Sequence, residues 1–327
     1  MRAFSYTRAT ALNHARAASA EAETALLAGG TTLLDLAKCG VADPAALVDI
    51  TQLPGLSAIS VETDGVLVGA LCKMSAVAED REIQSHYPAV SQALSLAASA
   101  QLRNMATIGG NLLQRTRCSY FRDPATFPAC NKRNPGSGCS ALGGVTRNHA
   151  VLGTSPHCIA SYPGDLAVAL VALEATVEIG ERAVLVEDFF LVPGDTPHRE
   201  TVLQPGEVIT GIRIPASAVA SNSLYLKVRD RQSYEFAAAS AAVGLELEAD
   251  GQTVRDIRVA VGGVATRPWR LRAVEQALKG QLLTPEAIEQ ASRLAAEGAL
   301  SQGDNSYKIE LLPRVVARAI LTVGGLA

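Results

Sequence analysis

Hydrophobic and polar positions change repeatedly between helix-like and strand-like spacing along the first third of the chain. This pattern predicts helices over Ala20–Leu26, Leu33–Lys38, Met74–Glu82 and Ala89–Ala100, and strands over Ala25–Ala28, Leu47–Ile50 and Val66–Ala70. The last of these helices consists almost entirely of small and apolar residues, which predicts that it is buried. The alternation of helix and strand between residues 19 and 50 predicts a small βαβ-like unit.

Periodic spacing returns at residue 165 and continues towards the C-terminus. It predicts helices over Asp165–Ala172, Pro285–Leu300 and Leu312–Leu321, and strands over Thr176–Ile179, Leu203–Ile214, Ala239–Leu247 and Ile257–Gly262. Helices and strands mix without a strict repeat, so the expected fold class is α+β. A chain of 327 residues is long enough for two domains, and we place their boundary near residue 220, giving domains over 1–220 and 221–327.

Between Leu112 and Cys158 the periodicity is lost in a run of prolines and glycines. About 45 irregular residues inside a compact domain are uncommon unless something other than a hydrophobic core orders them. Four of the six cysteines fall in this segment, at Cys118, Cys130, Cys139 and Cys158. The segment over about 114–160 is therefore the first candidate for a site with chemistry.

Composition excludes several classes of function. No stretch approaches the roughly 20 apolar residues that cross a bilayer, so we expect a globular protein without a membrane span. The net charge of −3 and the 4% aromatic content provide neither a basic surface nor stacking platforms for nucleic acid. No Gly-x-Ser-x-Gly or paired-carboxylate signature is present, so no catalytic residue is assigned. The first residues lack the apolar run of a secretory signal, and we expect no export signal in this chain.

Three polar turns are candidates for binding a long ligand that contains a diphosphate. Two of them, at residues 27–33 and 107–111, are rich in glycine, which lets backbone amides approach phosphate oxygens. The third ends in Asp165, whose carboxylate suits sugar-like hydroxyls. The alternatives are an ordinary tight turn capped by Thr32 and a plain helix N-cap at Asp165.

Four segments together resemble one family over nearly the whole chain: Ala28–Thr31, Arg103–Asn111, Lys227–Arg229 and Val261–Ala265. They resemble the FAD-binding middle subunits of molybdenum hydroxylases, the group that includes carbon monoxide dehydrogenase, xanthine dehydrogenase and aldehyde oxidoreductases. Asn111–Phe121, Cys130–Cys139 and Lys227–Arg231 are similar to the flavin subunits of bacterial periplasmic aldehyde oxidoreductases. Gly164 is a departure, because many relatives place a serine there.

This resemblance implies a PCMH-type (vanillyl-alcohol-oxidase-like) FAD-binding fold of two subdomains, followed by an α+β C-terminal domain of carbon monoxide dehydrogenase flavoprotein type. It also implies that the two glycine turns hold the FAD diphosphate, that Asp165 contacts the sugar-like chain, and that Lys227 lies near the isoalloxazine. The implied FAD-binding residues are Leu27, Ala28, Gly29, Gly30, Thr31, Thr32, Leu33, Thr107, Gly110, Asn111, Asp165 and Lys227.

The four clustered cysteines are separated by 11, 8 and 18 residues, which matches no ferredoxin or zinc-finger spacing. Spacing alone leaves an iron–sulfur cluster, zinc and two disulfides open. Basic neighbours favour thiolates, and they are Arg115, Arg117, Arg122, Lys132, Arg133 and Arg147. The resemblance implies a 4Fe-4S cluster held by Cys118, Cys130, Cys139 and Cys158. His157, beside Cys158, is interpreted as an ordinary loop residue.

The resulting hypothesis is an electron-transfer subunit of a heterotrimeric, molybdenum-dependent aldehyde oxidoreductase. The resemblance implies a large subunit with the molybdenum cofactor, a small subunit with 2Fe-2S clusters, and periplasmic location through a Tat signal on a partner, with the cytoplasm as the alternative. One rival function is a self-sufficient flavin oxidase or reductase of the UDP-N-acetylmuramate reductase type. Another is a binding module stabilised by zinc or disulfides.

Overall fold

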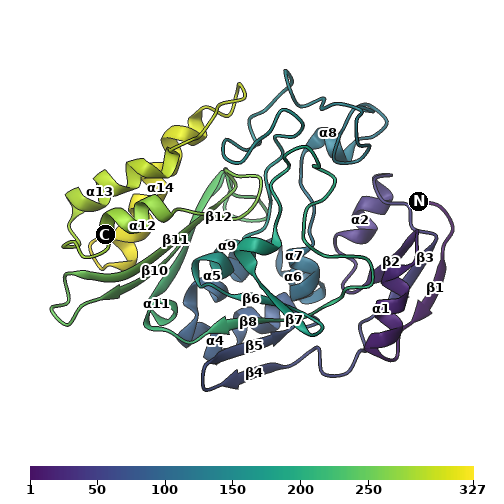
Figure 1. Cartoon of the computed structure of the whole chain (residues 1–327), viewed down its shortest axis with the longest axis horizontal. Helices are drawn as coiled ribbons and strands as arrows, with labels where there is room; N and C mark the ends of the chain where they lie inside the picture. Colours follow the sequence, from purple (N-terminus) through teal and green to yellow (C-terminus); the bar gives the residue numbers. More distant parts are fainter.

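Three structural units follow one another in this computed structural model, which describes residues 1–327 (Figure 1). The N-terminal unit is a three-stranded parallel sheet in the order β1-β3-β2 with two helices. Its elements are β1 (Ser5–Arg8), α1 (Leu12–Ala20), β2 (Thr24–Leu27), α2 (Leu33–Lys38) and β3 (Ala46–Asp49). The predicted βαβ-like unit is therefore confirmed.

One predicted helix in this unit, Ala20–Leu26, is wrong. The helix lies earlier in the chain and ends at Ala20, and Glu23 then adopts a left-handed backbone conformation with φ of 58°. Beyond it, Ala25–Leu27 pair with β3 as part of a strand. The chain reverses at Glu23, so the alanine-rich periodicity does not continue into the strand.

The middle unit contains a five-stranded antiparallel sheet in the order β4-β5-β8-β6-β7, covered by helices (Figure 1). The strands are β4 (Ile59–Glu62), β5 (Gly65–Gly69), β6 (Thr176–Ile179), β7 (Arg182–Leu185) and β8 (Ile209–Pro215). The helices are α3 (Met74–Glu79), α4 (Arg81–His86), α5 (Pro88–Leu96), α6 (Ala100–Met105), α7 (Ile108–Leu112), α9 (Leu166–Ala172) and α10 (Val186–Phe189). All seven residues of α9 are buried, so this helix forms the centre of the unit.

Of two predicted helices in the middle unit, Met74–Glu82 is divided in the structure, and Ala89–Ala100 ends early, at Leu96. Asp80 ends α3 and begins α4, because its carboxylate accepts hydrogen bonds from the backbone amides of Glu82 and Ile83. Ala98 has a φ of 47° and separates α5 from α6.

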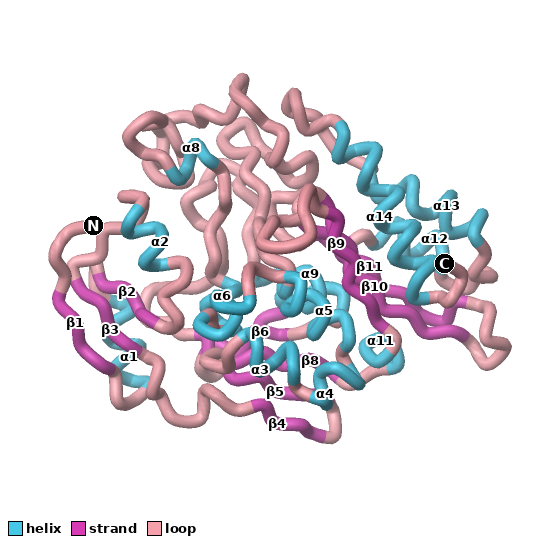
Figure 2. Tube along the Cα trace, turned by 180° about the vertical axis from the view of Figure 1, so that it is seen from behind, coloured by secondary structure: helices cyan, strands magenta, loops and turns pink.

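The C-terminal unit is a four-stranded antiparallel sheet with three helices on one side (Figure 2). It contains α11 (Ala218–Ser221), β9 (Ser223–Val228), β10 (Ala239–Leu247), β11 (Val254–Gly262), β12 (Trp269–Arg270), α12 (Arg272–Leu278), α13 (Pro285–Arg293), a 3-10 turn (Leu294–Ala296) and α14 (Tyr307–Val323). The outer face of the sheet packs on α14, whereas Tyr225, Ala242 and Ala260 belong to the core of the middle unit. The two units thus share a buried interface.

The cysteine loop, residues 113–165, lies at the top of the molecule as drawn in Figures 1 and 2. It contains a single short helix, α8 (Ser119–Arg122). The prediction of an irregular segment is confirmed. Polar contacts order much of it: the Arg133 guanidinium donates to the carbonyls of Tyr120, Phe121, Phe127 and Pro128. One arginine thus satisfies four carbonyls that a regular helix or sheet would otherwise pair.

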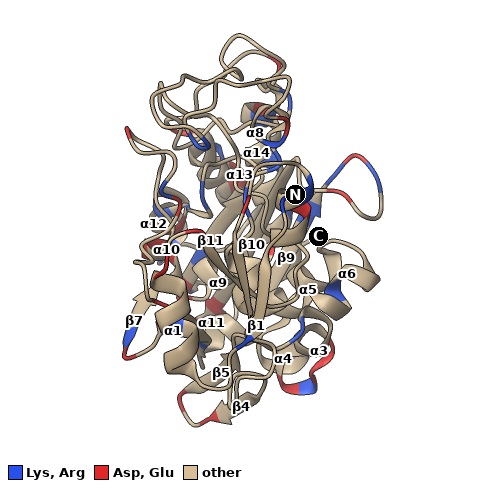
Figure 3. Ribbon diagram, turned by 90° about the vertical axis from the view of Figure 1, so that its right-hand side faces the viewer, with Lys and Arg blue, Asp and Glu red and all other residues tan.

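Charged residues of both signs are distributed over the chain rather than gathered on one face (Figure 3). None of the helices has the length and apolar character needed to cross a membrane.

A buried asparagine fastens the cysteine loop to the C-terminal unit. Asn305, fully buried before α14, donates its side-chain amide to the carbonyls of His149 and Ala150 at 3.3 and 3.0 Å, and accepts from the backbone amide of Gln302 at 2.8 Å. Beside it, Thr146 donates its hydroxyl to the carbonyl of Gln302 at 3.0 Å. We call these contacts the Asn305 latch.

Replacing Asn305 with alanine leaves two carbonyls and one amide without their partner, so we expect a loss of about 2 kcal/mol in the free energy of unfolding. Chemical denaturation measures this change. Ser306→Ala is the matched control, because Ser306 is the exposed neighbour and its side chain caps nothing. Equal stability of the two variants would contradict the role of the latch.

Candidate functional site

The two glycine turns meet through their backbones. A Cβ atom at Gly29 would lie 2.1 Å from the carbonyl oxygen of Met105, which ends α6 just before the second turn. The same oxygen accepts a hydrogen bond from the Lys73 ammonium at 2.9 Å. Gly30 has a φ of 72°, in the left-handed region that favours glycine. These glycines therefore bring the N-terminal and middle units into direct contact.

A cavity opens between these turns and the C-terminal unit, and we call it the glycine-loop cavity. Five of the predicted FAD-binding residues line it: Thr31, Thr32, Gly110, Asn111 and Asp165. The other seven predicted residues, Leu27, Ala28, Gly29, Gly30, Leu33, Thr107 and Lys227, are not among its lining residues. Thr107 and Lys227 nevertheless bond directly to lining residues, Gly110 and Asp165.

Several polar groups of the glycine-loop cavity lack an intramolecular partner. The Thr32 side chain makes no helix-capping bond, so the alternative of a turn capped by Thr32 is wrong. The side-chain oxygen of Asn111 is buried and accepts no hydrogen bond. A buried polar atom without a partner is costly, and it marks a position where a ligand supplies the missing hydrogen bond. The cavity thus fits a ligand with hydroxyl donors, as FAD has.

Asp165 lies between the middle and C-terminal units, and each of its carboxylate oxygens has one partner. It accepts hydrogen bonds from the Tyr225 hydroxyl at 2.6 Å and from the Lys227 ammonium at 2.8 Å. The side chains of Asp165 and Lys227 are 6% and 1% exposed. Asp165 makes no helix-capping bond, so the alternative of a plain N-cap is wrong. Its two partners come from β9, so the C-terminal unit completes the cavity.

The sequence analysis did not identify Tyr225 as a partner of Asp165, although the spacing of Tyr225 and Lys227 indicated it. Tyr225 and Lys227 are two residues apart on a strand, so they project from the same face of the sheet. It also missed the segment Arg231–Phe236, whose residues Arg231, Tyr234, Glu235 and Phe236 line the cavity. Arg117 reaches the cavity from the cysteine loop, and its guanidinium lies 5.0 Å from the centre of the Phe236 ring.

The four clustered cysteines line one small cavity, the cysteine cavity, although they are spread over 41 residues of the chain. None of them forms a disulfide. Burial raises the pKa of Cys118 to about 12, and burial likewise raises the pKa of Cys158. No group of three or more His, Cys, Asp or Glu side chains in the structure is arranged to hold a metal ion.

The six basic residues of the loop are expected to favour thiolates, and most of them make their contacts with other groups. Arg117 and Arg122 pair with Asp35 on α2, Arg147 pairs with Asp230, and Arg133 binds carbonyls. Lys132 is the exception, since its charge lowers the pKa of Cys158 against the effect of burial.

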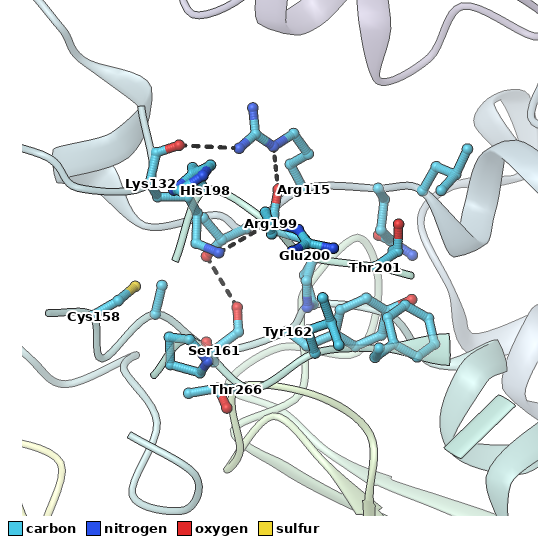
Figure 4. Close-up of a pocket in the computed structure, with 18 of the residues that line it drawn as sticks. Arg115, Lys132, Cys158, Ser161, Tyr162, His198, Arg199, Glu200, Thr201 and Thr266 are labelled. Atoms are coloured by element: carbon cyan, nitrogen blue, oxygen red, sulfur yellow. Dashed lines mark hydrogen bonds and ion pairs between the residues drawn. The ribbon is translucent and has the colours of Figure 1, made fainter. Parts of the chain in front are cut away.

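A further cavity, the Arg115 cavity, is drawn in Figure 4 and borders both the glycine-loop cavity and the cysteine cavity. It shares Gln114 and Pro163 with the first and Lys132, Cys158 and Ala160 with the second. Arg115 and Lys132 both pair with Glu200. Figure 4 shows these three side chains and Cys158 around the same space.

Comparison with known proteins gives a consistent result. Residues 2–217 match the family described as the FAD binding domain in molybdopterin dehydrogenase, and residues 224–323 match the CO dehydrogenase flavoprotein C-terminal domain. The chain is 41% identical to the aldehyde oxidoreductase FAD-binding subunit of Escherichia coli (strain K12), over 98% of both chains. It is 29% identical to the carbon monoxide dehydrogenase medium chain of Hydrogenophaga pseudoflava, over 90% of this chain and 87% of that one.

A solved structure of carbon monoxide dehydrogenase from Hydrogenophaga pseudoflava superposes with a TM-score of 0.77 at 26% identity, and the match covers 100% of this chain and 99% of that chain. The chain therefore belongs to the family of FAD-binding medium subunits of molybdenum hydroxylase-type enzymes. It is an oxidoreductase subunit, and its cofactor is FAD. The two-part fold expected from the resemblance is confirmed.

Gly110 offers a direct test of the glycine-loop cavity. A Cβ atom there would meet only the Thr107 hydroxyl, at 3.0 Å, so a small shift of that side chain makes room for it, and Gly110 lines the cavity where the cofactor is expected. We expect Gly110→Val to lower FAD affinity at least about tenfold, the effect of 1.4 kcal/mol. Flavin absorbance of the purified protein measures this, and circular dichroism checks the fold.

Ala100→Val is the matched control, since Ala100 is exposed on the neighbouring helix α6 and does not line the cavity. If Gly110→Val retains its full flavin content, the assignment of this turn to FAD is wrong.

Proposed function

We propose that this chain is the FAD- and 4Fe-4S-binding electron-transfer subunit of a heterotrimeric, molybdenum-dependent aldehyde oxidoreductase. The observation that carries the proposal is the continuity of the cavities. The glycine-loop cavity adjoins the Arg115 cavity, which in turn adjoins the cysteine cavity through Cys158. A flavin and a cluster bound at these two ends would be neighbours, as electron transfer requires.

FAD supplies the redox chemistry, and the residues of the chain hold and orient it. Thr31, Thr32 and Gly110 line the side of the cavity where the diphosphate is expected. The free side-chain oxygen of Asn111 provides an acceptor. Asp165, held by Tyr225 and Lys227, retains lone pairs that accept hydrogen bonds from the sugar-like chain.

Three observations support a 4Fe-4S cluster at Cys118, Cys130, Cys139 and Cys158. The four side chains line one cavity, they are free of disulfides, and the cavity has no carboxylate in its lining. A 4Fe-4S cluster takes one thiolate for each iron, so its ligands surround a cluster and do not converge on a single ion. Structural zinc would instead need four ligands that converge within about 2.3 Å of one ion, so metal analysis of the purified chain distinguishes the two.

The burial of the thiols also bears on how iron would bind. Because burial raises the pKa of Cys118 to about 12, this thiol stays protonated at neutral pH in the metal-free protein. Forming the thiolate costs free energy, and iron binding offsets this cost as it displaces the proton.

We expect the purified wild-type complex to contain four irons in this chain, and Cys130→Ser to lose them. Iron analysis and the visible spectrum of the cluster measure this outcome. Cys39→Ser is the matched control, because Cys39 is also unpaired and lies outside the cysteine cavity. Iron near zero in the wild type, or one zinc per chain, would contradict the cluster.

The proposal also includes two partners, a large subunit with the molybdenum cofactor and a small subunit with 2Fe-2S clusters. We expect the chain expressed alone to oxidise no aldehyde, and the chain purified from its native host to bring both partners with it. Affinity purification followed by an activity assay tests this. Aldehyde turnover by the isolated chain would favour the self-sufficient flavin oxidase instead.

A further inference from the structure

His149 contacts a cysteine sulfur, whereas His157, the histidine beside Cys158 in the sequence, pairs with a carboxylate. The Nε2 atom of His149 lies 3.2 Å from the Sγ atom of Cys118, and the residue is 5% exposed. His157, in contrast, is half-exposed, and its ring pairs with Asp195 at 3.3 Å. His149 follows Cys118 by 31 residues, so sequence proximity did not indicate the contact.

The direction of this hydrogen bond follows from the ligand state of Cys118. A cysteine that binds iron is a thiolate and carries no proton, so Nε2 must be the donor. The other ring nitrogen, Nδ1, is buried and has no hydrogen-bond partner. The single proton of a neutral imidazole therefore belongs on Nε2, where it makes the only hydrogen bond available to the ring.

The Asn305 latch fixes the position of His149. Asn305 binds the carbonyl of His149, and the His149 amide donates to the carbonyl of Thr146 at 2.8 Å. The ring also lies near Tyr120, with 6.0 Å between ring centres. The backbone of His149 is thus held by the C-terminal unit and by its own loop, and its imidazole lies between Tyr120 and Cys118.

His149 also lies on the side of Cys118 that faces the glycine-loop cavity. Together with Cys118 it lines a fourth cavity, which shares Arg117, Asp165 and Phe236 with the glycine-loop cavity. Cys118 lines both this cavity and the cysteine cavity. The contact is therefore placed between the two expected redox groups.

We infer that His149 donates a hydrogen bond to the cluster ligand Cys118 and raises the reduction potential of the cluster. This inference rests on the proposed function, because it requires the cluster. A hydrogen bond to a ligand sulfur stabilises the reduced cluster more than the oxidised one, since the reduced cluster carries one more negative charge. His149 is a positioning residue that acts through Cys118 and touches no substrate.

The test uses the purified complex and a redox titration followed by electron paramagnetic resonance. We expect His149→Phe to keep its iron and to lower the ratio of reduced to oxidised cluster about tenfold at a fixed potential, a downward shift of about 59 mV for one electron. His149→Gln keeps an N–H donor, and we expect it to stay closer to the wild type than His149→Phe does. His86→Phe is the control, because His86 is exposed on α4 and lines none of these cavities, and we expect no shift.

An unchanged potential in His149→Phe, with iron retained, would overturn the inference and leave the cluster itself in place. A wild-type complex without iron would instead overturn the proposed function. If His149→Phe loses its iron, the inference is tested on the wild-type complex instead. Pulsed electron paramagnetic resonance of the reduced wild-type complex is expected to show one exchangeable proton and one nitrogen coupled to the cluster. Absence of both couplings overturns the inference.

Discussion

The buried ion pair between Lys227 and Asp165 is the contact on which the arrangement of the site depends. Both side chains are almost completely shielded from water, and separating them would leave an uncompensated charge in the interior, at a cost of about 3–5 kcal/mol. Lys227 belongs to β9 and Asp165 immediately precedes α9, so the pair ties the C-terminal sheet to the centre of the middle unit. This ion pair holds the two sides of the glycine-loop cavity together.

A second set of contacts connects the C-terminal unit to the cysteine loop. The Asn305 latch connects the turn before α14 to residues 146–150, which belong to the cysteine loop. Asp35 of α2 pairs with Arg117 and Arg122 on the other side of that loop. The loop is thus fastened to all three units although it has little regular structure. A segment whose ends and middle are held in this way loses most of its freedom before any metal binds.

Much of the fold was predictable because local signals agree with the tertiary structure. The helix Leu33–Lys38 and the strands Thr176–Ile179 and Ala239–Leu247 have the predicted bounds. The breaks at Glu23 and Ala98 were not predictable, because non-glycine residues rarely adopt a positive φ and their sequence gives no sign of it. Tertiary contacts impose those two reversals.

The residues of the site were likewise predictable only in part. The turns at residues 31–32 and 110–111, Asp165 and the four cysteines were found from motifs and resemblance, and the structure brings each set to a common cavity. The partners of these residues were not found. Tyr225, Asp35 and His149 act across 60, 82 and 31 residues of chain. Contacts of that kind depend on how the units pack, which a single sequence does not encode in its local pattern.

The contact between Gly29 and the Met105 carbonyl changes how a glycine motif should be interpreted. No L-residue with a side chain fits at Gly29, with or without a cofactor, because the obstacle is a main-chain atom of the protein itself. Gly110 meets only a hydroxyl, so the protein itself restricts this position much less, and a bound cofactor would be the stronger constraint. In a diverged relative that has given up its flavin, selection would still preserve the first glycine and release the second. Gly110, and not the more prominent Gly29, is thus the informative marker of cofactor loss.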